Sequence, residues 1–392
     1  MHDQAGDGPL SGLRVVELPA IGPVPFAAML LADLGADVIR VDRPEDVGSD
    51  PSDPLARVYA GLDPTGRSRR RVAIDLKSPE GIDVALRIAD RSDVLLEGFR
   101  PGVAERLGLG PNVCTERNPA LIYARMTGWG QAGPLASAVG HDINYVALAG
   151  VLDSIGHDGG PPVAPLGYLG DFGGGGLFLA FGVLAAAEER HRSGRGQVVD
   201  TAVVDGVGLL GSVQRYLRLS GAMPSPRGTN GLDGGHPAYR VYETADDQWV
   251  SFGAVEPRFQ AELADRLGVN AAEWDDPACW PASRQRVADL IRSRTRAEWV
   301  EILDGADACF APVLTHEQTM LHPHHQARRA FIDVAGESQV APGPRFDRTP
   351  ARHPRPAPAP GEQGNDVLSS LGWAASEVDE LVRNGAITLP HL

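Results

Sequence analysis

Four features of the sequence contain side chains that can transfer protons or bind anions. His141 lies in the segment GHDINY, Asp171 precedes four glycines in GDFGGGG, Glu256 lies in AVEPRF, and arginines are scattered through the first half of the chain. A histidine between glycine and aspartate is usually a hydrogen-bonded loop residue, and an aspartate before a helix is usually an N-cap. Residue type alone therefore leaves a catalytic and a structural interpretation for each of them.

The glycine run after Asp171 favours a functional role for this residue. Four consecutive glycines at the start of an apolar helix reduce its stability, so we expect something to approach the backbone closely there. A helix N-terminus with uncrowded N–H groups can stabilise a developing oxyanion, and the helix dipole favours an ionised carboxylate beside it. The alternative is close packing of a glycine-rich helix against its neighbours.

Strand-like and helical segments alternate around these residues. LRVVEL and ADVIRVDR predict two strands that flank a helix near residues 25–34, and VAIDL, DVLLEGF and ALIYARM predict three further strands. An apolar helix is expected from about residue 172 to residue 192, closed by Gly194, with a second helical stretch near 200–220. This alternation predicts an α/β fold with a mainly parallel, Rossmann-like sheet. The turn IGPVP lacks the glycine pattern of dinucleotide-binding folds, which argues against a nicotinamide cofactor.

The second half of the chain has a different character. The glycine- and proline-rich loop GAMPSPRGTNGLDGGHP predicts a linker, and the paired strand-like runs of AYRVYETADDQWVSFGAV, followed by helices, predict a smaller domain that extends to about residue 315. A proline-rich connector, RTPARHPRPAPAPGEQG, and a short helix follow it.

Composition excludes several classes of protein. A length of 392 residues and a hydrophobic content of 43% support more than one core, and a formal net charge of −15 opposes binding to nucleic acids or anionic lipids. Three separated cysteines favour a reducing, cytoplasmic setting. The sequence has neither a long apolar run nor a signal-like N-terminus, so membrane insertion is not predicted. The histidines of LHPHHQ match no zinc pattern, so no metal site is predicted.

A basic run stands out against this acidic background. Arg67, Arg69, Arg70 and Arg71 lie within RSRRR, and such a concentration of cations indicates either a phosphate-bearing ligand or a solvated loop. Phosphate contacts from Arg70 or Arg71 are therefore one expectation, and an exposed loop is the other.

Across nearly its whole length the sequence resembles the class III CoA-transferase (CaiB/BaiF) family. The shared motifs include LSGLRVVELPAIGP, LADLGADVIRVDRP, AIDLKSPEG and EGFRPGVAERLGLG, and later SGRGQVVDTAVVDG and LDGGHPAY. ARMTGWGQAGP, GHDINY, GDFGGG and GAVEPRF resemble the α-methylacyl-CoA racemase branch. The resemblance implies a large Rossmann-like domain over residues 1–220, completed by about 325–392, and a small α+β domain over 221–324. It also implies an interlocked homodimer with the active site at the subunit interface.

The resemblance further implies roles for individual residues. His141 and Asp171 correspond to catalytic bases on opposite faces of the substrate α-carbon, and Glu256, contributed by the neighbouring chain, orients and charges His141. The residues expected to hold coenzyme A or to flank the pantetheine and thioester are Ile21, Arg43, Ile74, Lys77, Arg100, Arg106, Gly140, Asp142 and Tyr145. The sequence departs from the family in the segment 44–71, which is longer than expected.

Together these roles imply a 2-methylacyl-CoA racemase or epimerase, which inverts the α-carbon by deprotonation and reprotonation through an enolate. No cofactor is implied beyond the CoA moiety of an acyl-CoA substrate, and the acyl chain stays open. Two alternatives also stay open. A CoA-transferase would use Asp171 as a covalent nucleophile and would need no histidine, and a non-catalytic acyl-CoA-binding protein would need only the arginines.

Overall fold

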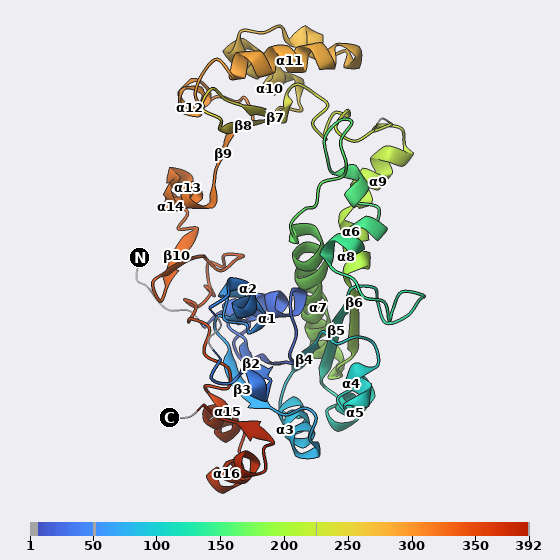
Figure 1. Ribbon diagram of the computed structural model, residues 1–392, viewed down its shortest axis with the longest axis vertical. Helices are drawn as coiled ribbons and strands as arrows, with labels where there is room; N and C mark the ends of the chain where they lie inside the picture. Colours follow the sequence, from blue (N-terminus) through green and yellow to red (C-terminus); the bar gives the residue numbers. More distant parts are fainter. Residues whose placement is uncertain (1–6, 50–51, 225, 391–392) are drawn as a thin grey trace. The chain divides into compact units, whose positions relative to one another are not determined.

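The computed structural model describes residues 7–49, 52–224 and 226–390, which divide into two compact units (Figure 1). Unit 1 comprises the described residues up to 149, residues 165–210 and the chain from 331 onward; unit 2 comprises residues 150–164 and 211–330. The expected domain limits differ from this division in three places. The second unit begins near residue 211 rather than 221, it ends at residue 330 rather than 324, and it includes residues 150–164, which we expected in the large domain.

Contacts within unit 2 explain why residues 150–164 belong to it. Arg227 donates a hydrogen bond from Nη1 to Oδ1 of Asp153 at 2.9 Å. A Cβ atom built on Gly228 would lie 2.4 Å from the backbone nitrogen of Asp158, so the two backbones are in close contact. The predicted linker therefore packs against an earlier segment of the chain, which sequence spacing does not indicate.

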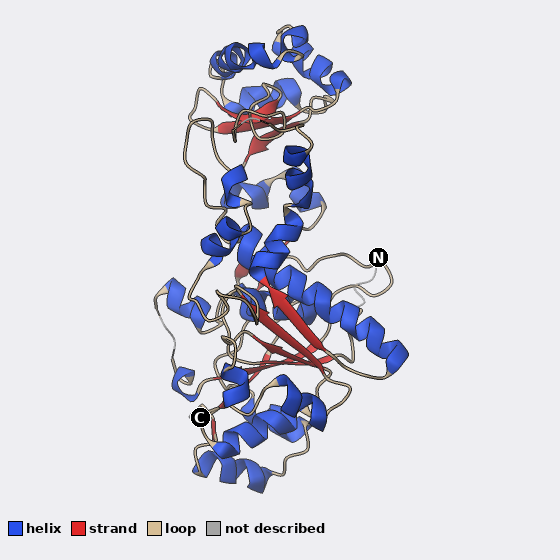
Figure 2. Ribbon diagram, turned by 90° about the vertical axis from the view of Figure 1, so that its right-hand side faces the viewer, coloured by secondary structure: helices blue, strands red, loops and turns tan. Residues whose placement is uncertain are grey.

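A seven-stranded sheet with the order β12-β3-β2-β1-β4-β5-β6 forms the centre of unit 1 (Figure 2). The six parallel strands are β1 (Arg14–Glu17), β2 (Asp37–Asp42), β3 (Arg70–Ile74), β4 (Val94–Glu97), β5 (Ile122–Thr127) and β6 (Val198–Ala202); β12 (Ile387–Thr388) pairs antiparallel with β3. The order 3-2-1-4-5-6 is that of doubly wound folds, in which ligands bind beyond the carboxyl ends of the strands where the order reverses. Here that point lies between β1 and β4, and the predicted α/β class is confirmed.

Both ends of the chain contribute to the core of unit 1. Val16 and Ile39 on the central strands share one hydrophobic cluster with Val367, Leu371 and Trp373 near the C-terminus. The helices of unit 1 are α1 (Pro23–Asp33), α2 (Pro54–Tyr59), α3 (Pro79–Ala89), α4 (Val103–Arg106), α5 (Pro111–Arg117), α6 (Asp142–Leu148), α7 (Phe178–Ser193), α8 (Val203–Leu210), α15 (Gly364–Ser370) and α16 (Ala375–Arg383). Single 3-10 turns occur at η1 (Pro44–Asp46) and η2 (Pro64–Gly66), and β10 (Phe331–Val334) pairs with β11 (Glu337–Val340) as a hairpin.

The glycine run lies in a π-helix rather than at the start of an α-helix. The π-helix η4 (Tyr168–Leu177) precedes α7, which ends at Gly194 in a left-handed conformation with φ 71°. Cβ atoms built on Gly174 and Gly176 would lie 2.6 Å from the nitrogen of Val207 on α8 and 2.6 Å from the carbonyl oxygen of Pro23 on α1. Helix packing therefore accounts for the glycines after Asp171. By length and apolar composition the segment 168–193 could also span a membrane; here its glycines pack within unit 1.

The basic run is neither a phosphate site nor a solvated loop, because its arginines form ion pairs within unit 1. Arg67 and Arg71 each bind one carboxylate with two nitrogens, on Asp33 and Asp42 respectively, at 2.5–3.0 Å. Arg70 binds Asp37 in the same way. Each of these arginines therefore neutralises a carboxylate on α1 or β2, and the expectation of phosphate contacts from Arg70 or Arg71 is wrong.

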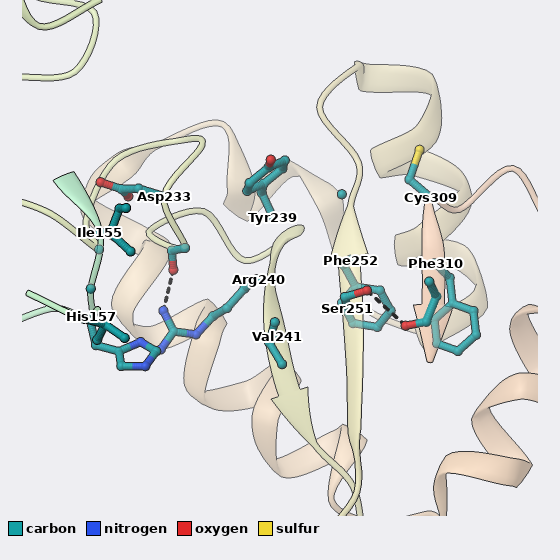
Figure 3. A pocket seen from close by; sticks show the side chains of 16 residues that line it. Ile155, His157, Asp233, Tyr239, Arg240, Val241, Ser251, Phe252, Cys309 and Phe310 are labelled. Carbon is teal, nitrogen blue, oxygen red and sulfur yellow. Dashed lines mark hydrogen bonds between the residues drawn. The ribbon is translucent and has the colours of Figure 1, made fainter. Parts of the chain in front are cut away.

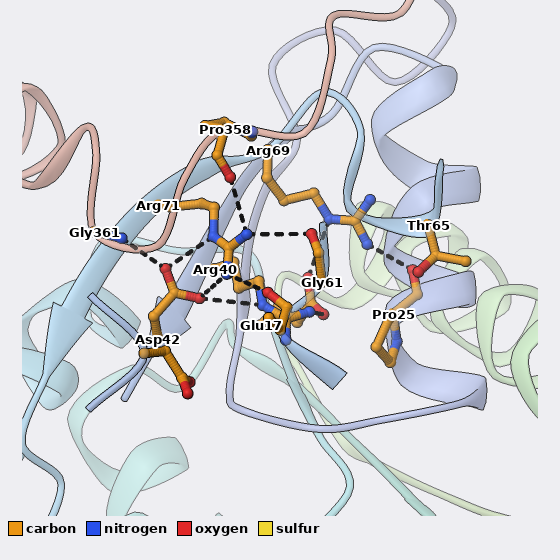
Figure 4. Close-up of polar contacts among 12 residues, drawn as sticks. Glu17, Pro25, Arg40, Asp42, Gly61, Thr65, Arg69, Arg71, Pro358 and Gly361 are labelled. Carbon is orange, nitrogen blue, oxygen red and sulfur yellow. Dashed lines mark hydrogen bonds and ion pairs between the residues drawn. The ribbon is translucent and has the colours of Figure 1, made fainter. Parts of the chain in front are cut away.

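The most deeply buried part of this network surrounds Glu17 (Figure 4). The Glu17 side chain is fully buried, and it accepts from Nη1 of Arg40 at 3.0 Å and from Nε of Arg69 at 3.1 Å. Arg69 also donates to the carbonyl oxygen of Pro25 in α1, and Arg71 donates to that of Pro358 in the proline-rich connector. The network thus joins β1, β2, β3, α1 and the C-terminal segment.

Unit 2 is a three-stranded antiparallel sheet covered by helices. The strands are β7 (Tyr239–Glu243), β8 (Trp249–Gly253) and β9 (Phe310–Val313), in that order. Its helices are α9 (Ser212–Leu219), α10 (Pro257–Leu267), α11 (Trp280–Ile291), α12 (Arg296–Leu303), α13 (His316–Leu321) and α14 (Pro323–Ala327), with 3-10 turns η3 (Leu152–Ser154), η5 (Ala271–Trp274) and η6 (Pro277–Cys279). Tyr242, Phe252, Trp274 and Trp299 belong to its separate core, which is consistent with an independent α+β domain.

Candidate active site

Asp171 lies where the strand order of the sheet reverses. Gly22 follows β1 and caps α1 with φ 68°, and a Cβ atom built on it would lie 3.2 Å from Oδ2 of Asp171. Any larger residue at position 22 would therefore press on the carboxyl group. Pro23 and Pro25 have no N–H, so α1 lacks two of the donors that hold a pyrophosphate in dinucleotide-binding folds.

His141 is held at the start of α6 by its own neighbours. The exposed His141 is the N-cap residue, and its backbone N–H donates to Oδ1 of Asn144 at 3.0 Å. The hydroxyl group of Tyr145 donates to the carbonyl oxygen of Gly140. The Trp129 ring meets the Tyr145 ring edge-on, with the centroids 4.7 Å apart. The peptide that precedes His141 is therefore fixed by two aromatic side chains.

Asp142 connects α6 directly to Asp171. Its Oδ1 accepts the backbone N–H of Asp171 at 2.8 Å. The N–H of Asp171 is therefore already used, and an oxyanion donor at the start of this helix would have to be another backbone N–H. The sequence predicted Asp142 beside the pantetheine but gave no indication of this contact.

The pKa of Asp171 is raised to about 6, mainly by burial and further by the negative charge of Asp142, while His141 lowers it. The expectation that the helix dipole keeps this carboxyl ionised is therefore wrong, because its pKa is raised and not lowered. A carboxyl group with a pKa near 6 is able both to accept and to donate a proton near neutral pH.

Tyr145 and Arg100 belong to the same electrostatic neighbourhood. The pKa of Tyr145 is raised, first by burial and then by the charge of Asp171, whereas Arg100 lowers it. Unit 1 therefore brings together five residues that the sequence selected: Arg100, His141, Asp142, Tyr145 and Asp171.

Several residues expected to hold coenzyme A are accessible after the carboxyl ends of the strands. Arg43 directly follows β2, Lys77 lies three residues after β3, and Arg100 lies three residues after β4; all three are exposed, as are Ile21 and Arg106. Because the strands are parallel, these cations lie toward the same edge of the sheet, and cations gathered there favour binding of anions.

Ile74, which the resemblance places at the nucleotide end of coenzyme A, does not present its side chain to a ligand. It is 1% exposed, it belongs to the main hydrophobic cluster, and it is paired with Ile387 on β12. The family motif marks the right strand end, but the side chain at this position packs in the core with residues of α3 and α15, including Val84, Val367 and Leu368.

Glu256 belongs to unit 2, whereas His141 and Asp171 belong to unit 1. It follows β8, occupies the N-cap position of α10 and is exposed. Burial raises the pKa of the Cys309 thiol, and the charge of Glu256 raises it further, so the two side chains are neighbours.

A cavity of about 610 Å³ lies in unit 2 near Glu256 (Figure 3). Its mainly apolar wall is formed by the segment 150–164, by the loop before β7 and by β7, β8 and β9. Gly253, three residues before Glu256, and its neighbour Cys309 both line it. Sequence reasoning missed this cavity because its walls come from segments that are far apart along the chain.

Within residues 7–49, 52–224 and 226–390, no group of three or more histidine, cysteine or acidic side chains could hold a metal ion.

Comparisons with known proteins place the chain among acyl-CoA enzymes. The model of CoA-transferase family III matches residues 10–364. The α-methylacyl-CoA racemases of Mus musculus and Homo sapiens are 44% and 43% identical to this chain, over 95% of its length and 96% of theirs. The succinyl-CoA–L-malate CoA-transferase β subunit of Chloroflexus aurantiacus is 30% identical over the same shares.

Solved structures of proteins from the same family have a similar fold. A CaiB/BaiF family protein from Brucella suis has a TM-score of 0.79 and 25% identity, and the match covers 93% of this chain and 99% of that one. A hypothetical protein from Mycobacterium tuberculosis has a TM-score of 0.76 and 29% identity, with coverage of 93% and 100%. The similarity therefore extends over both units.

Proposed function

Because the chain belongs to CoA-transferase family III, we propose that it is a 2-methylacyl-CoA racemase in which His141 and Asp171 are the two catalytic bases. The observation that carries this proposal is the raised pKa of Asp171, about 6, in a carboxyl group that interacts with His141. The more similar of the relatives named above, which bear the name α-methylacyl-CoA racemase, support the same reaction.

The proposed reaction needs a pair of bases with similar proton affinity. An imidazole in water has a pKa of about 6.5, so a carboxyl group with a pKa of about 6 exchanges a proton with an imidazole at little cost in free energy. In one direction the Asp171 carboxylate removes the α-proton while the His141 imidazolium returns one from the opposite face. In the other direction neutral His141 removes the proton and protonated Asp171 returns it, so the configuration inverts either way.

The proposed function is tested by incubating the protein with single epimers of several 2-methylacyl-CoA esters in deuterated water. We expect deuterium to appear at the α-carbon and the other epimer to form. Chiral analysis of the released acids measures the amount of each epimer. Covalent attachment of CoA to Asp171, detected by mass spectrometry after incubation with acyl-CoA, would instead establish a CoA-transferase. Tight acyl-CoA binding without α-hydrogen exchange would establish a binding protein.

We also propose that the active protein is a homodimer in which Glu256 of one chain serves His141 of the other. Large apolar side chains are exposed on two helices: Leu177, Phe181 and Leu184 along η4 and α7, and Val213, Tyr216 and Leu219 on α9. Contiguous exposed apolar surfaces of this kind usually mark protein interfaces. A carboxylate beside His141 would stabilise its imidazolium form.

Removing this carboxylate is expected to slow inversion. In Glu256→Gln we expect kcat to fall about tenfold to a hundredfold, because the imidazolium form loses a stabilising charge. Co-expression of His141→Ala and Glu256→Ala chains tests the shared site, since each mixed dimer contains one site with both native residues. Activity should then rise to about a quarter of the wild-type value, because about half of the dimers are mixed and each has one intact site. Activity no higher than that of the two separate variants would show that the residues act within one chain.

A further inference from the structure

We infer that Asp142 is a positioning residue for the proposed catalytic Asp171: its carboxylate fixes the place of Asp171 and sets a second negative charge beside that side chain. The inference rests on the proposed function, in which Asp171 accepts and donates the α-proton. It assigns Asp142 a task other than the contact with the pantetheine that the family resemblance implies.

The backbone geometry requires Asp142 to lie against Asp171. Oδ1 of Asp142 accepts the N–H of Asp171 at 2.8 Å. A Cβ atom built on Gly170 would lie 2.0 Å from Oδ1 and 2.7 Å from Cγ of Asp142, so the carboxylate occupies the space that a side chain at position 170 would take. The glycine before Asp171 therefore has a purpose distinct from the glycines after it, which pack against α1 and α8.

This contact also couples the two proposed bases. Asp142 is the first residue of α6 and is adjacent in sequence to His141, the N-cap residue. The same short segment therefore carries one base and holds the backbone of the other. A shift of α6 would therefore act on both proposed bases.

The two carboxylates repel each other, and neither forms an ion pair among the described residues. Among the ion pairs found between residues 7–49, 52–224 and 226–390, none involves Asp142 or Asp171. The charge of Asp142 raises the pKa of Asp171 in addition to the larger effect of burial. A negative charge next to a carboxyl group that transfers protons thus shifts the pKa of that group toward neutral pH, where it can both accept and donate a proton.

The other titratable groups near Asp171 or on elements that surround it come from five elements. His141 and Tyr145 belong to the α6 segment, and Arg100 lies after β4. Helix α8 contributes the exposed Asp205, η4 itself contributes the exposed Tyr168, and the only titratable residue of α1 is Asp33 at its far end. Of these groups, His141 lowers the pKa of Asp171 and Asp142 raises it.

The sign of the expected pH effect follows from the mechanism. Below the lower pKa of the base pair both bases are protonated, neither can remove the α-proton, and kcat/KM falls. Removing the charge of Asp142 lowers the pKa of Asp171, so the acidic limb of the profile moves to lower pH. We expect a shift of up to about one pH unit, because burial remains.

The experiment compares Asp142→Asn with Asp142→Ala in full-length protein. Asparagine retains an oxygen that can accept the Asp171 N–H but removes the charge; we expect a shifted acidic limb and a smaller loss of kcat at the pH optimum than in the alanine variant. Alanine removes both the charge and the acceptor, so the same shift should be accompanied by a loss of kcat of tenfold or more, roughly. A purely structural role predicts that the Asn profile superimposes on that of wild type, which would overturn the inference.

A second variant addresses the same contact from the other side. In Gly170→Ala the new methyl group would displace the Asp142 carboxylate, so the acidic limb should again move to lower pH. Gly208→Ala on α8 is a matched control, because a Cβ atom there would have no neighbour within 4 Å, and its profile should not change. If wild-type protein exchanges no α-hydrogen, the proposed function fails. If the wild-type protein exchanges the α-hydrogen but neither Asp142→Asn nor Gly170→Ala shifts the acidic limb of the pH profile, only the role of Asp142 fails.

Discussion

Asp171→Asn is expected to reduce the rate of α-carbon inversion about a thousandfold, within the range that loss of a general acid–base group causes. The amide has nearly the same shape as the carboxyl, and the N–H of residue 171 still donates to Asp142, so the π-helix should keep its place. The amide does not accept or return the proton near neutral pH. Chiral analysis of the product under saturating substrate measures the loss directly, and an unchanged midpoint of thermal unfolding serves as the control for folding.

The variant should also show a selective exchange of the α-hydrogen. Without Asp171, His141 can still remove and return a proton on its own face of the α-carbon, so one epimer should exchange its α-hydrogen for deuterium with retention of configuration. His141→Gln should show the mirror result, with exchange of the opposite epimer by Asp171. Equal loss of exchange for both epimers in both variants would contradict a two-base reaction.

The fold was predictable because it depends on local alternation. The strands and the helix between residues 13 and 43 each have a hydrophobic period of their own, and connection rules for parallel strands leave few arrangements for such units. The family motifs then selected His141 and Asp171, which unit 1 brings into one electrostatic neighbourhood. Short-range patterns therefore carried the general location of the candidate site.

Long-range partners were not predictable in the same way. Arg67 binds Asp33 and Arg70 binds Asp37, both more than 30 residues away, and nothing local to RSRRR indicates these partners. The motif around Ile74 likewise marks a strand end but does not reveal that the side chain is paired with Ile387 from the C-terminus. In both cases residues distant in sequence decided whether a side chain is accessible to a ligand.

The protonation of Asp171 shows how magnitudes decide between two effects. A helix dipole stabilises a nearby carboxylate by about 0.3–1 kcal/mol at an exposed site. The rise in pKa from 3.8 to about 6 corresponds to about 3 kcal/mol in the opposite direction. Burial beneath Gly22 and repulsion by Asp142 therefore outweigh the dipole, and neither could be inferred from the residues next to Asp171.

Glu17→Gln should lower the free energy of unfolding of unit 1 by about 3–5 kcal/mol, because it leaves the buried Arg69 without its carboxylate partner and leaves Arg40 with Asp42 alone. The Glu17 side chain has no exposed surface, and it accepts from Arg40 and Arg69, which are 4% and 2% exposed. Glutamine keeps the shape but its amide NH₂ faces a guanidinium donor. Urea denaturation, followed by a probe in unit 1, measures the change without screening the charges.

The exposed pair of Glu188 and Arg192 on α7 provides the matched control. Its nitrogen–oxygen distance of 3.0 Å equals that between Glu17 and Arg40, but its side chains are 68% and 67% exposed. Glu188→Gln should therefore cost less than about 0.5 kcal/mol, since water and salt screen such pairs. Equal costs for the two variants would show that the Glu17 network contributes no more than a surface pair.

The Glu17→Gln substitution should also affect catalysis at the candidate site. Arg69 donates to the carbonyl oxygen of Pro25, and α1 begins at the Gly22 turn that lies against the Asp171 carboxyl. An arginine that has lost its carboxylate partner holds α1 less firmly, so inversion should slow more in Glu17→Gln than in Glu188→Gln, even at temperatures where both variants are folded. A variant that is less stable but fully active would instead show that the network stabilises the sheet without fixing the position of α1.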